Sequence, residues 1–282
     1  MARPAPTRRL VLGGLAGLAL GGLPLGCTTW PTPTVPMRVR QIAARCGPTR
    51  RCVLLPGVYS RADDFVSEGF VEDLQRSAPG CEMLLADAHL GYFVEGELVR
   101  RLREDVVRPP ATAGDVAGAA TDHAARPWLV GVSLGGLAAL AYAMRHGDEI
   151  AGVLAIAPYL GQRTLLRDIS AAGGPLAWSR DVPANDTGAD PFEVIEADVW
   201  RWLARRSVEE GRGATVSPPI HLGFGRDDRF ADAQRVLQSM LPTGHTDVVD
   251  GGHDWPPWRA LWRQWLQRGL LGGPAGGCGG TA

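Results

Sequence analysis

A serine lies among small residues in the stretch Gly131-Val132-Ser133-Leu134-Gly135-Gly136. The apolar run Trp128-Leu129-Val130 precedes it, and the small-residue stretch 137–141 follows. This order indicates a strand, a sharp turn and a helix, the context in which a G-x-S-x-G serine is exposed to a substrate. Glycine lets neighbouring backbone approach closely in such a turn, and the amino end of the helix favours negative charge that develops beside the serine. We therefore expect Ser133 to be a nucleophile.

The elements that would position this serine follow from the alternation of short apolar runs with longer stretches of helical periodicity. This alternation is typical of an α/β protein with a doubly wound, mostly parallel sheet. The runs predict six strands, at Cys52–Leu55, Met83–Ala86, Trp128–Val132, Ile150–Ile156, Ile220–Phe224 and Thr246–Val249.

Helical periodicity is found between these strands, at 63–76, 98–106 and 137–145, and after the last of them. There Trp258, Trp262 and Trp265 have the i, i+4, i+7 spacing of one buried helix face. The gap between Ile156 and Ile220 is too long for one crossover and contains two helical stretches, 164–171 and 192–206. We predict an inserted helical cap at about 161–217, with Trp178, Trp200 and Trp202 among its apolar residues.

The strand, turn and helix around Ser133 resemble those of the α/β-hydrolase family, and the resemblance covers about Val53 to Leu266. In that family the catalytic triad follows the order serine, acid, histidine along the chain. Four of the six histidines precede the candidate acid loop, which leaves His245 and His253. His245 enters the last predicted strand at the end opposite the serine, whereas His253 follows its carboxyl end, where ligands of such sheets gather. The resemblance therefore implies His253 as the general base.

The loop Gly223-Phe224-Gly225-Arg226-Asp227-Asp228 follows the next-to-last predicted strand and supplies two candidate acids. The family commonly places the acid three residues after the turn glycine, which favours Asp228 and leaves Asp227 as the alternative. The acid would accept the Nδ1 proton of His253 and fix its tautomer.

An oxyanion hole requires two backbone donors. The family supplies one from the residue after the nucleophile, here Leu134. The other comes from the loop after the first strand, where relatives usually have a histidine and this chain has Pro56. We carry over only the backbone N–H of Val58, with Tyr59 as second choice.

The composition excludes several classes of chemistry. The sequence contains no lysine, so its 29 basic residues are all arginine, and Schiff-base lysine, pyridoxal phosphate and Walker A sites are excluded. The net charge of -1 argues against a nucleic-acid partner. No metal motif has the required spacing, and we expect neither a cofactor nor a metal ion.

The first 26 residues have the composition of an export signal. Arg3, Arg8 and Arg9 precede an uncharged run from Leu10 to Leu25 that is too short and too rich in glycine for a spanning helix. The run ends in Leu23-Pro24-Leu25-Gly26-Cys27, which resembles a bacterial lipobox with Cys27 as the lipidated residue. Pro24 departs from that pattern, so ordinary signal peptidase cleavage is an alternative. The two arginines leave twin-arginine and general secretion both open.

Three further segments complete the predicted organisation. Residues 27–36 contain the anchor cysteine and three prolines, which suggests an extended tether. Residues 37–271 form the hydrolase domain, and 272–282 form a glycine-rich tail that we expect to be disordered.

An exported protein can form disulfides. Cys52 and Cys81 each stand at the start of a predicted strand. The family fold makes these two strands parallel neighbours, so equal offsets would bring the cysteines within disulfide range. We predict a Cys52–Cys81 disulfide. Cys46 is a rival partner, and two buried thiols are the other alternative.

Together these features predict a serine hydrolase that cleaves small-molecule carboxylic esters and is anchored through Cys27 on the periplasmic side of a bacterial cell envelope. An acyltransferase or a thioesterase could use the same triad, because an acyl-enzyme does not specify its acceptor. A different class is a non-catalytic envelope lipoprotein that uses the fold as a binding module. The complete set of serine, acid and histidine weighs against this last alternative.

Overall fold

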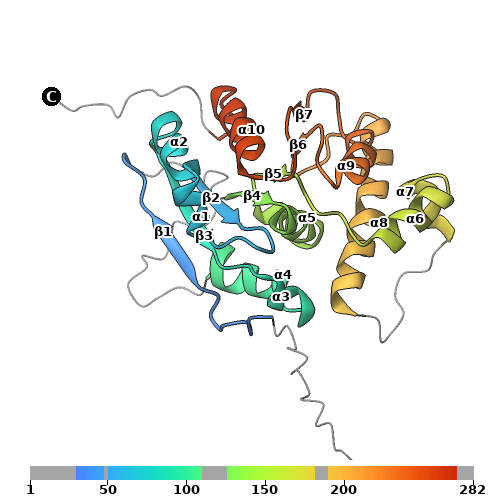
Figure 1. Cartoon of the computed structure of the whole chain (residues 1–282), viewed down its shortest axis with the longest axis horizontal. Coiled ribbons are helices and arrows are strands. Elements are labelled where there is room, and N and C mark those ends of the chain that lie inside the picture. The colour runs from blue at the N-terminus through green and yellow to red at the C-terminus, as the bar shows by residue number, and fades with distance from the viewer. Residues whose placement is uncertain (1–29, 48–49, 110–125, 182–189, 272–282) are drawn as a thin grey trace, which may run out of the picture. The chain divides into compact units, whose positions relative to one another are not determined.

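A seven-stranded sheet organises the computed structural model, which describes residues 30–47, 50–109, 126–181 and 190–271 (Figure 1). The sheet order is β1-β3-β2-β4-β5-β6-β7, and β1 pairs antiparallel with β3 while the other pairs are parallel. The strands are β1 (Val39–Ile42), β2 (Arg50–Leu55), β3 (Cys81–Ala86), β4 (Trp128–Val132), β5 (Gly152–Ile156), β6 (Ile220–Gly225) and β7 (Thr246–Val249). This is the α/β-hydrolase fold, and the predicted fold class is confirmed.

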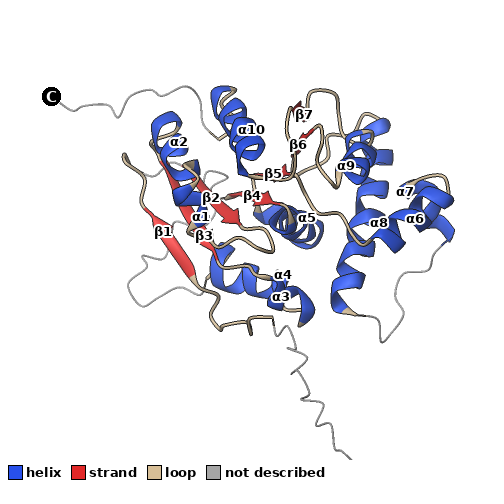
Figure 2. Cartoon of the chain, viewed as in Figure 1, coloured by secondary structure: helices blue, strands red, loops and turns tan. Residues whose placement is uncertain are grey.

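Helices cover both faces of the sheet (Figure 2). One face carries α1 (Asp64–Ser67), α2 (Phe70–Ser77) and α10 (Trp255–Gln267). The other carries α3 (Leu90–Val94), α4 (Leu98–Arg101), the π-helix η1 (Leu102–Val107), α5 (Leu134–His146) and α9 (Ala231–Gln238). A 3-10 turn, η3 (Gly147–Glu149), follows α5.

The two faces have separate apolar cores. On the α10 side the predicted tryptophan stripe is buried, and Phe70 stacks on Trp262 with ring centroids 5.5 Å apart. On the other side α5 is buried over its first ten residues, because it packs on the central strands and is covered in turn by α8 (Pro191–Gly211). The turn at Ser133, called the elbow below, therefore lies between a central strand and the buried part of α5.

Three helices lie between β5 and β6: α6 (Arg163–Ala171), α7 (Pro175–Asp181) and α8. Of these, α7 was not predicted. Trp200 of α8 is buried and donates from Nε1 to the carbonyl oxygen of Leu160 at 2.6 Å, so this insertion is fixed to the segment that leaves β5.

Some elements differ from the sequence predictions for local reasons. The edge strand β1 was missed because its four residues, VRQI, include two polar ones and are half-buried or exposed. The single helix predicted at 63–76 is interrupted at Gly69, whose φ of 78° is left-handed. The helix predicted at 98–106 changes from α-helix to π-helix at Leu102.

The predicted Cys52–Cys81 disulfide is wrong, because both cysteines are free and buried. The reason is register: Cys52 pairs with Met83 and Cys81 pairs with Arg50, so the two offsets are not equal. Burial and the neighbouring Cys81 thiol raise the pKa of Cys52 well above its ordinary value. Cys46, the rival partner, is itself disulfide-bonded.

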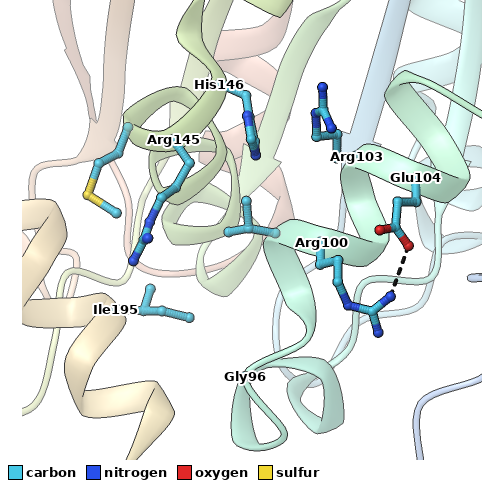
Figure 3. A pocket seen from close by; sticks show the side chains of 9 residues that line it. Gly96, Arg100, Arg103, Glu104, Arg145, His146 and Ile195 are labelled. Atoms are coloured by element: carbon cyan, nitrogen blue, oxygen red, sulfur yellow. Dashed lines mark hydrogen bonds and ion pairs between the residues drawn. The ribbon is translucent and has the colours of Figure 1, made fainter. Parts of the chain in front are cut away.

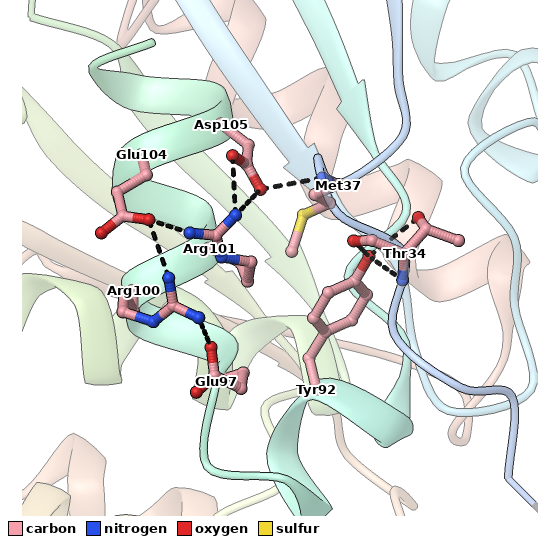
Figure 4. Close-up of polar contacts among 8 residues, drawn as sticks. All are labelled: Thr34, Met37, Tyr92, Glu97, Arg100, Arg101, Glu104 and Asp105. Atoms are coloured by element: carbon pink, nitrogen blue, oxygen red, sulfur yellow. Dashed lines mark hydrogen bonds and ion pairs between the residues drawn. The ribbon is translucent and has the colours of Figure 1, made fainter. Parts of the chain in front are cut away.

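The segment before β1 is held to the body of the domain (Figure 4). Thr34 contacts the Tyr92 hydroxyl of α3 through both its backbone and its side chain, and the Met37 N–H donates to Asp105 Oδ2 at 2.8 Å. Asp105, which accepts from Met37, also forms an ion pair with Arg101, and Arg101 pairs with Glu104 as well. The Pro31 carbonyl oxygen also lies against Gly91 of α3, where it leaves no room for a Cβ, so the segment contacts the domain before residue 37.

The predicted signal peptide, Cys27 and the glycine-rich tail lie outside the described residues. Within the described residues, no helix combines the length and apolar character needed to cross a membrane.

Candidate active site

Ser133 occupies a strained turn between β4 and α5. Its backbone has φ 52° and ψ −116°, a left-handed φ that non-glycine residues adopt mainly where surrounding structure enforces it. The enforcement is visible: the Ser133 N–H donates to the Ile156 carbonyl oxygen at 2.9 Å, and a Cβ on Gly135 would overlap the carbonyl oxygen of Leu55. The glycine after the serine is thus required by close approach to the end of β2.

His253 lies beside this serine in the loop between β7 and α10. Its Nε2 is 2.8 Å from Ser133 Oγ, and its Nδ1 is 2.8 Å from Asp228 Oδ2. A carboxylate oxygen can only accept, so Nδ1 donates to Asp228 and Nε2 is left to accept the serine proton. The structure therefore brings Ser133, His253 and Asp228 into one hydrogen-bonded series.

The two adjacent aspartates after β6 have different surroundings. Asp228 is 5% exposed, and its second carboxylate oxygen accepts from the Phe230 N–H at 2.8 Å. Asp227 is exposed, and its backbone N–H donates to the Gly251 carbonyl oxygen. Only Asp228 reaches His253, as the sequence favoured.

Two aromatic rings that the sequence analysis did not assign to the site hold the imidazole between them. Phe230 and Trp258 each meet His253 edge to face, with centroids 4.9 and 5.0 Å away. Phe230 follows Asp228 by two residues in the same loop, so its closeness to the candidate acid could have indicated in the sequence that it lies near the site. These contacts restrict rotation of the His253 ring.

The loop after β2 lies against the serine, as the predicted oxyanion hole requires. An ideal Cβ on Gly57 would be 3.3 Å from Ser133 Cβ, so this loop and the elbow touch. Val58 is half-buried beside Gly57, whereas Tyr59 is 84% exposed. Leu134 is the first residue of α5, so its N–H is among those that have no partner within the helix.

One hollow among the described residues lies away from Ser133 (Figure 3). It has a volume of about 430 Å³ and is near the carboxyl end of α5, a helix of 13 residues that is about 20 Å long. Its arginines are already paired, for example Arg103 with Glu149 at 2.7 Å. Its lining residues are Gly96, Val99, Arg100, Arg103, Glu104, Met144, Arg145, His146 and Ile195.

Within the parts of the chain that the structure describes, no group of three or more His, Cys, Asp or Glu side chains could hold a metal ion.

The comparison with protein families decides what class of enzyme this geometry belongs to. A family model described as "Putative esterase" matches residues 116–268, more than half of the chain. The chain belongs to this esterase family. The matched residues include Ser133, Asp228 and His253, and the protein is a carboxylic ester hydrolase.

Solved structures support the fold of this esterase. It is similar to an S-formylglutathione hydrolase (FrmB) from Staphylococcus aureus, with a TM-score of 0.54 and 13% identity over 82% of this chain and 89% of that one. It also resembles Est1E from Butyrivibrio proteoclasticus, with a TM-score of 0.52 and 14% identity over 83% and 93%. A third is a monoacylglycerol lipase from Paleococcus ferrophilus, with a TM-score of 0.51 and 18% identity over 82% and 98%. None of the curated proteins compared with the chain matches it.

Proposed function

We propose that this esterase cleaves carboxylic esters through an acyl-enzyme on Ser133. The observation that carries the proposal is the pair of 2.8 Å hydrogen bonds that join Ser133 Oγ to His253 Nε2 and His253 Nδ1 to Asp228 Oδ2. Nucleophile, base and orienting acid are then in the geometry that serine hydrolysis needs.

In the first half-reaction, Ser133 Oγ attacks the ester carbonyl carbon while His253 Nε2 takes its proton. The negative oxygen of the tetrahedral intermediate is held by the backbone N–H groups of Val58 and Leu134, and the dipole of α5 adds to this stabilisation. His253 then returns the proton to the alcohol oxygen as the carbon–oxygen bond breaks. In the second half-reaction, water attacks the acyl carbonyl carbon while His253 takes its proton. His253 then returns the proton to Ser133 Oγ as the acyl bond breaks, and the carboxylic acid is released.

The insertion of α6, α7 and α8 is proposed as the cap that selects the acyl group. The insertion leaves the sheet beside the site, at Ala157-Pro158 directly after β5, and the Tyr159 N–H binds the Ser133 carbonyl oxygen there. It returns at Pro218-Pro219 before β6, at the opposite edge of the sheet, because β5 and β6 are parallel. Replacing residues 161–217 by a short glycine-serine linker should flatten the dependence of rate on acyl chain length. An unchanged dependence would place the acyl pocket elsewhere.

The cellular location remains a proposal based on the sequence. We propose that the protein is exported and anchored to a membrane of the bacterial envelope through lipid on Cys27. Cys27→Ser should move the protein from the membrane fraction to the soluble fraction. If the variant and the wild type fractionate alike, the lipid anchor is refuted.

Hydrolysis of p-nitrophenyl esters from acetate to palmitate tests the proposed mechanism. Ser133→Ala and His253→Ala should each lower kcat by a factor on the order of 10⁴ to 10⁶, and the double variant should be little worse than either, because the two residues act as a unit. Retention of wild-type rates by Ser133→Ala would refute the mechanism.

A further inference from the structure

The segment that leaves β5 is tied directly to the nucleophile. The Tyr159 N–H donates to the Ser133 carbonyl oxygen at 3.0 Å, and the Ala157 N–H donates to Gly223. Ala157 has a left-handed φ of 46°, a second strained non-glycine residue in the same region as Ser133. The buried Gln234 side chain donates to the Pro158 carbonyl oxygen at 3.3 Å. The backbone of Tyr159 is therefore fixed relative to the reacting hydroxyl.

The side chain of Tyr159 is fixed as well. Its ring meets Phe230 edge to face at 5.5 Å, and Phe230 in turn contacts His253. Phe192 of α8 lies on another side of the ring, 6.0 Å away. The ring is only half-buried, and it follows β5 at the sheet edge where ligands of this fold class bind.

The third restraint on the ring comes from a buried carboxylate in α8. Glu196 is 1% exposed; its Oε1 accepts from the Tyr159 hydroxyl at 2.8 Å and its Oε2 from the Gln162 N–H at 3.0 Å. Burial and the nearby charges of Glu193 and Asp190 raise the pKa of Glu196, and the two hydrogen bonds oppose that rise. Both of these bonds go to the segment that connects β5 to the cap.

Burying a carboxylate costs free energy that an apolar side chain of similar size would not. The carboxylate does what an apolar side chain cannot: its two oxygens fix one phenol and one backbone N–H in defined places. Because the phenol belongs to a ring that packs on Phe230, the aromatic neighbour of His253, the benefit of this arrangement falls on the geometry of the site.

We propose that the Tyr159 ring is a specificity-determining wall of the acyl-binding site and that Glu196 is the positioning residue that holds it there. This inference rests on the proposed function, because it assumes that the acyl group becomes attached to Ser133. A wall held at its backbone, its ring edge and its hydroxyl cannot move aside for a longer or bulkier apolar acyl group. Acyl groups that fit against the ring face bind, and larger ones are excluded.

Four substitutions in the full chain separate positioning from stability. Tyr159→Ala removes the wall, and Glu196→Leu removes both hydrogen bonds to the connecting segment. Glu196→Gln is the conservative variant: its amide oxygen can accept from Gln162 while its NH₂ donates to the phenol oxygen. Tyr142→Phe is the matched control. Tyr142 also donates from its phenol to a buried carboxylate, that of Glu149, at 2.7 Å. It lies in the carboxyl-terminal half of α5, away from Ser133 at the start of that helix.

The measurement is kcat and KM for p-nitrophenyl acetate and p-nitrophenyl octanoate, with Tm recorded for each variant. Each buried methylene changes kcat/KM by about fourfold. Tyr159→Ala and Glu196→Leu should therefore raise the octanoate-to-acetate ratio of kcat/KM at least tenfold, mainly by lowering KM for the octanoate ester. Glu196→Gln should restore the ratio to within about threefold of the wild type. Tyr142→Phe should lower Tm and leave the ratio unchanged.

Three results would overturn the inference: an unchanged ratio in both Tyr159→Ala and Glu196→Leu, an equal change in Tyr142→Phe, or no difference between Glu196→Gln and Glu196→Leu. If Glu196→Leu does not fold, the comparison of Glu196→Gln with Tyr159→Ala decides it. Labelling of the wild type by a fluorophosphonate separates this inference from the proposed function. A wild type labelled at Ser133 with an unchanged ratio in the variants refutes the wall alone, whereas an unlabelled Ser133 refutes the proposed function.

Discussion

Replacing Asp228 by asparagine should nearly abolish esterase activity, for a reason that can be worked out atom by atom. One carboxylate oxygen of Asp228 accepts from the Phe230 N–H and the other accepts from His253 Nδ1, both at 2.8 Å. The Phe230 N–H can only donate, so it fixes the amide oxygen of the asparagine on its own side. The asparagine NH₂ then faces His253 Nδ1.

Two donors cannot share one hydrogen bond, so His253 must change tautomer and carry its proton on Nε2. That nitrogen is 2.8 Å from Ser133 Oγ and can no longer accept the serine proton. Loss of the correct tautomer in such a triad lowers kcat by about 10⁴, which corresponds to about 5.4 kcal/mol of transition-state stabilisation.

Asp227→Asn is the control for this experiment. Asp227 is exposed, and its contact with Gly251 uses only its backbone, so its substitution should change kcat/KM by less than about threefold, as most surface substitutions have small effects. Both variants are assayed with p-nitrophenyl acetate at pH 8, with Tm measured to show that they are folded. An Asp228→Asn variant within tenfold of the wild type, or a greater loss for Asp227→Asn, would refute this assignment of the acid.

Three more predictions follow from the described residues. Gly135→Ala should cost at least about 100-fold in kcat/KM, because its Cβ would displace the strand end that carries the oxyanion loop; Gly211→Ala, in open space, should leave the rate unchanged. Burial lowers the pKa of His221 to about 4, below its unfolded value of about 6.5. The free energy of unfolding should therefore fall as the pH drops from 6.5 to 4, because the unfolded chain binds a proton that the folded chain does not. Urea titrations should show a smaller fall for His221→Gln, and an equal fall in both proteins would contradict this prediction. Peptide mapping without reduction should find Cys46 in a disulfide with neither Cys52 nor Cys81, because Cys46 is disulfide-bonded and those two cysteines are free. A peptide that links Cys46 to Cys52 or Cys81 would contradict this prediction, and a link to Cys27 would refute the proposed lipid anchor.

The sequence was informative where chemistry depends on residues close together in the chain. The turn around Ser133 needs glycines at fixed positions, and the order of serine, acid and histidine removed all histidines but His253 and His245. The choice between Asp227 and Asp228 could not be made from residue type, because both are aspartates and what distinguishes them is the direction in which each side chain points from the loop. In the structure burial distinguishes them: Asp228 is buried and Asp227 is exposed.

Contacts between distant parts of the chain left no periodic signal in the sequence. Glu196 lies 37 residues after Tyr159, on a helix whose other acids are solvated or half-buried, and only the packing of α8 brings the two together. Strand register was also invisible, which is why equal offsets were assumed for Cys52 and Cys81 and the predicted disulfide was wrong. The strand β1 is too short and too polar to stand out from a loop.

The most direct test of the acyl-enzyme mechanism is to locate the residue that becomes covalently modified. The full chain is treated with a fluorophosphonate, digested, and mapped by mass spectrometry, alongside Ser133→Ala and His253→Ala. We predict a single adduct on the peptide that contains Ser133, no adduct in Ser133→Ala, and labelling slowed at least 100-fold in His253→Ala, because the serine loses its base. An esterase that remains active while Ser133 stays unmodified, or that is inactivated by an adduct at another residue, would contradict the account.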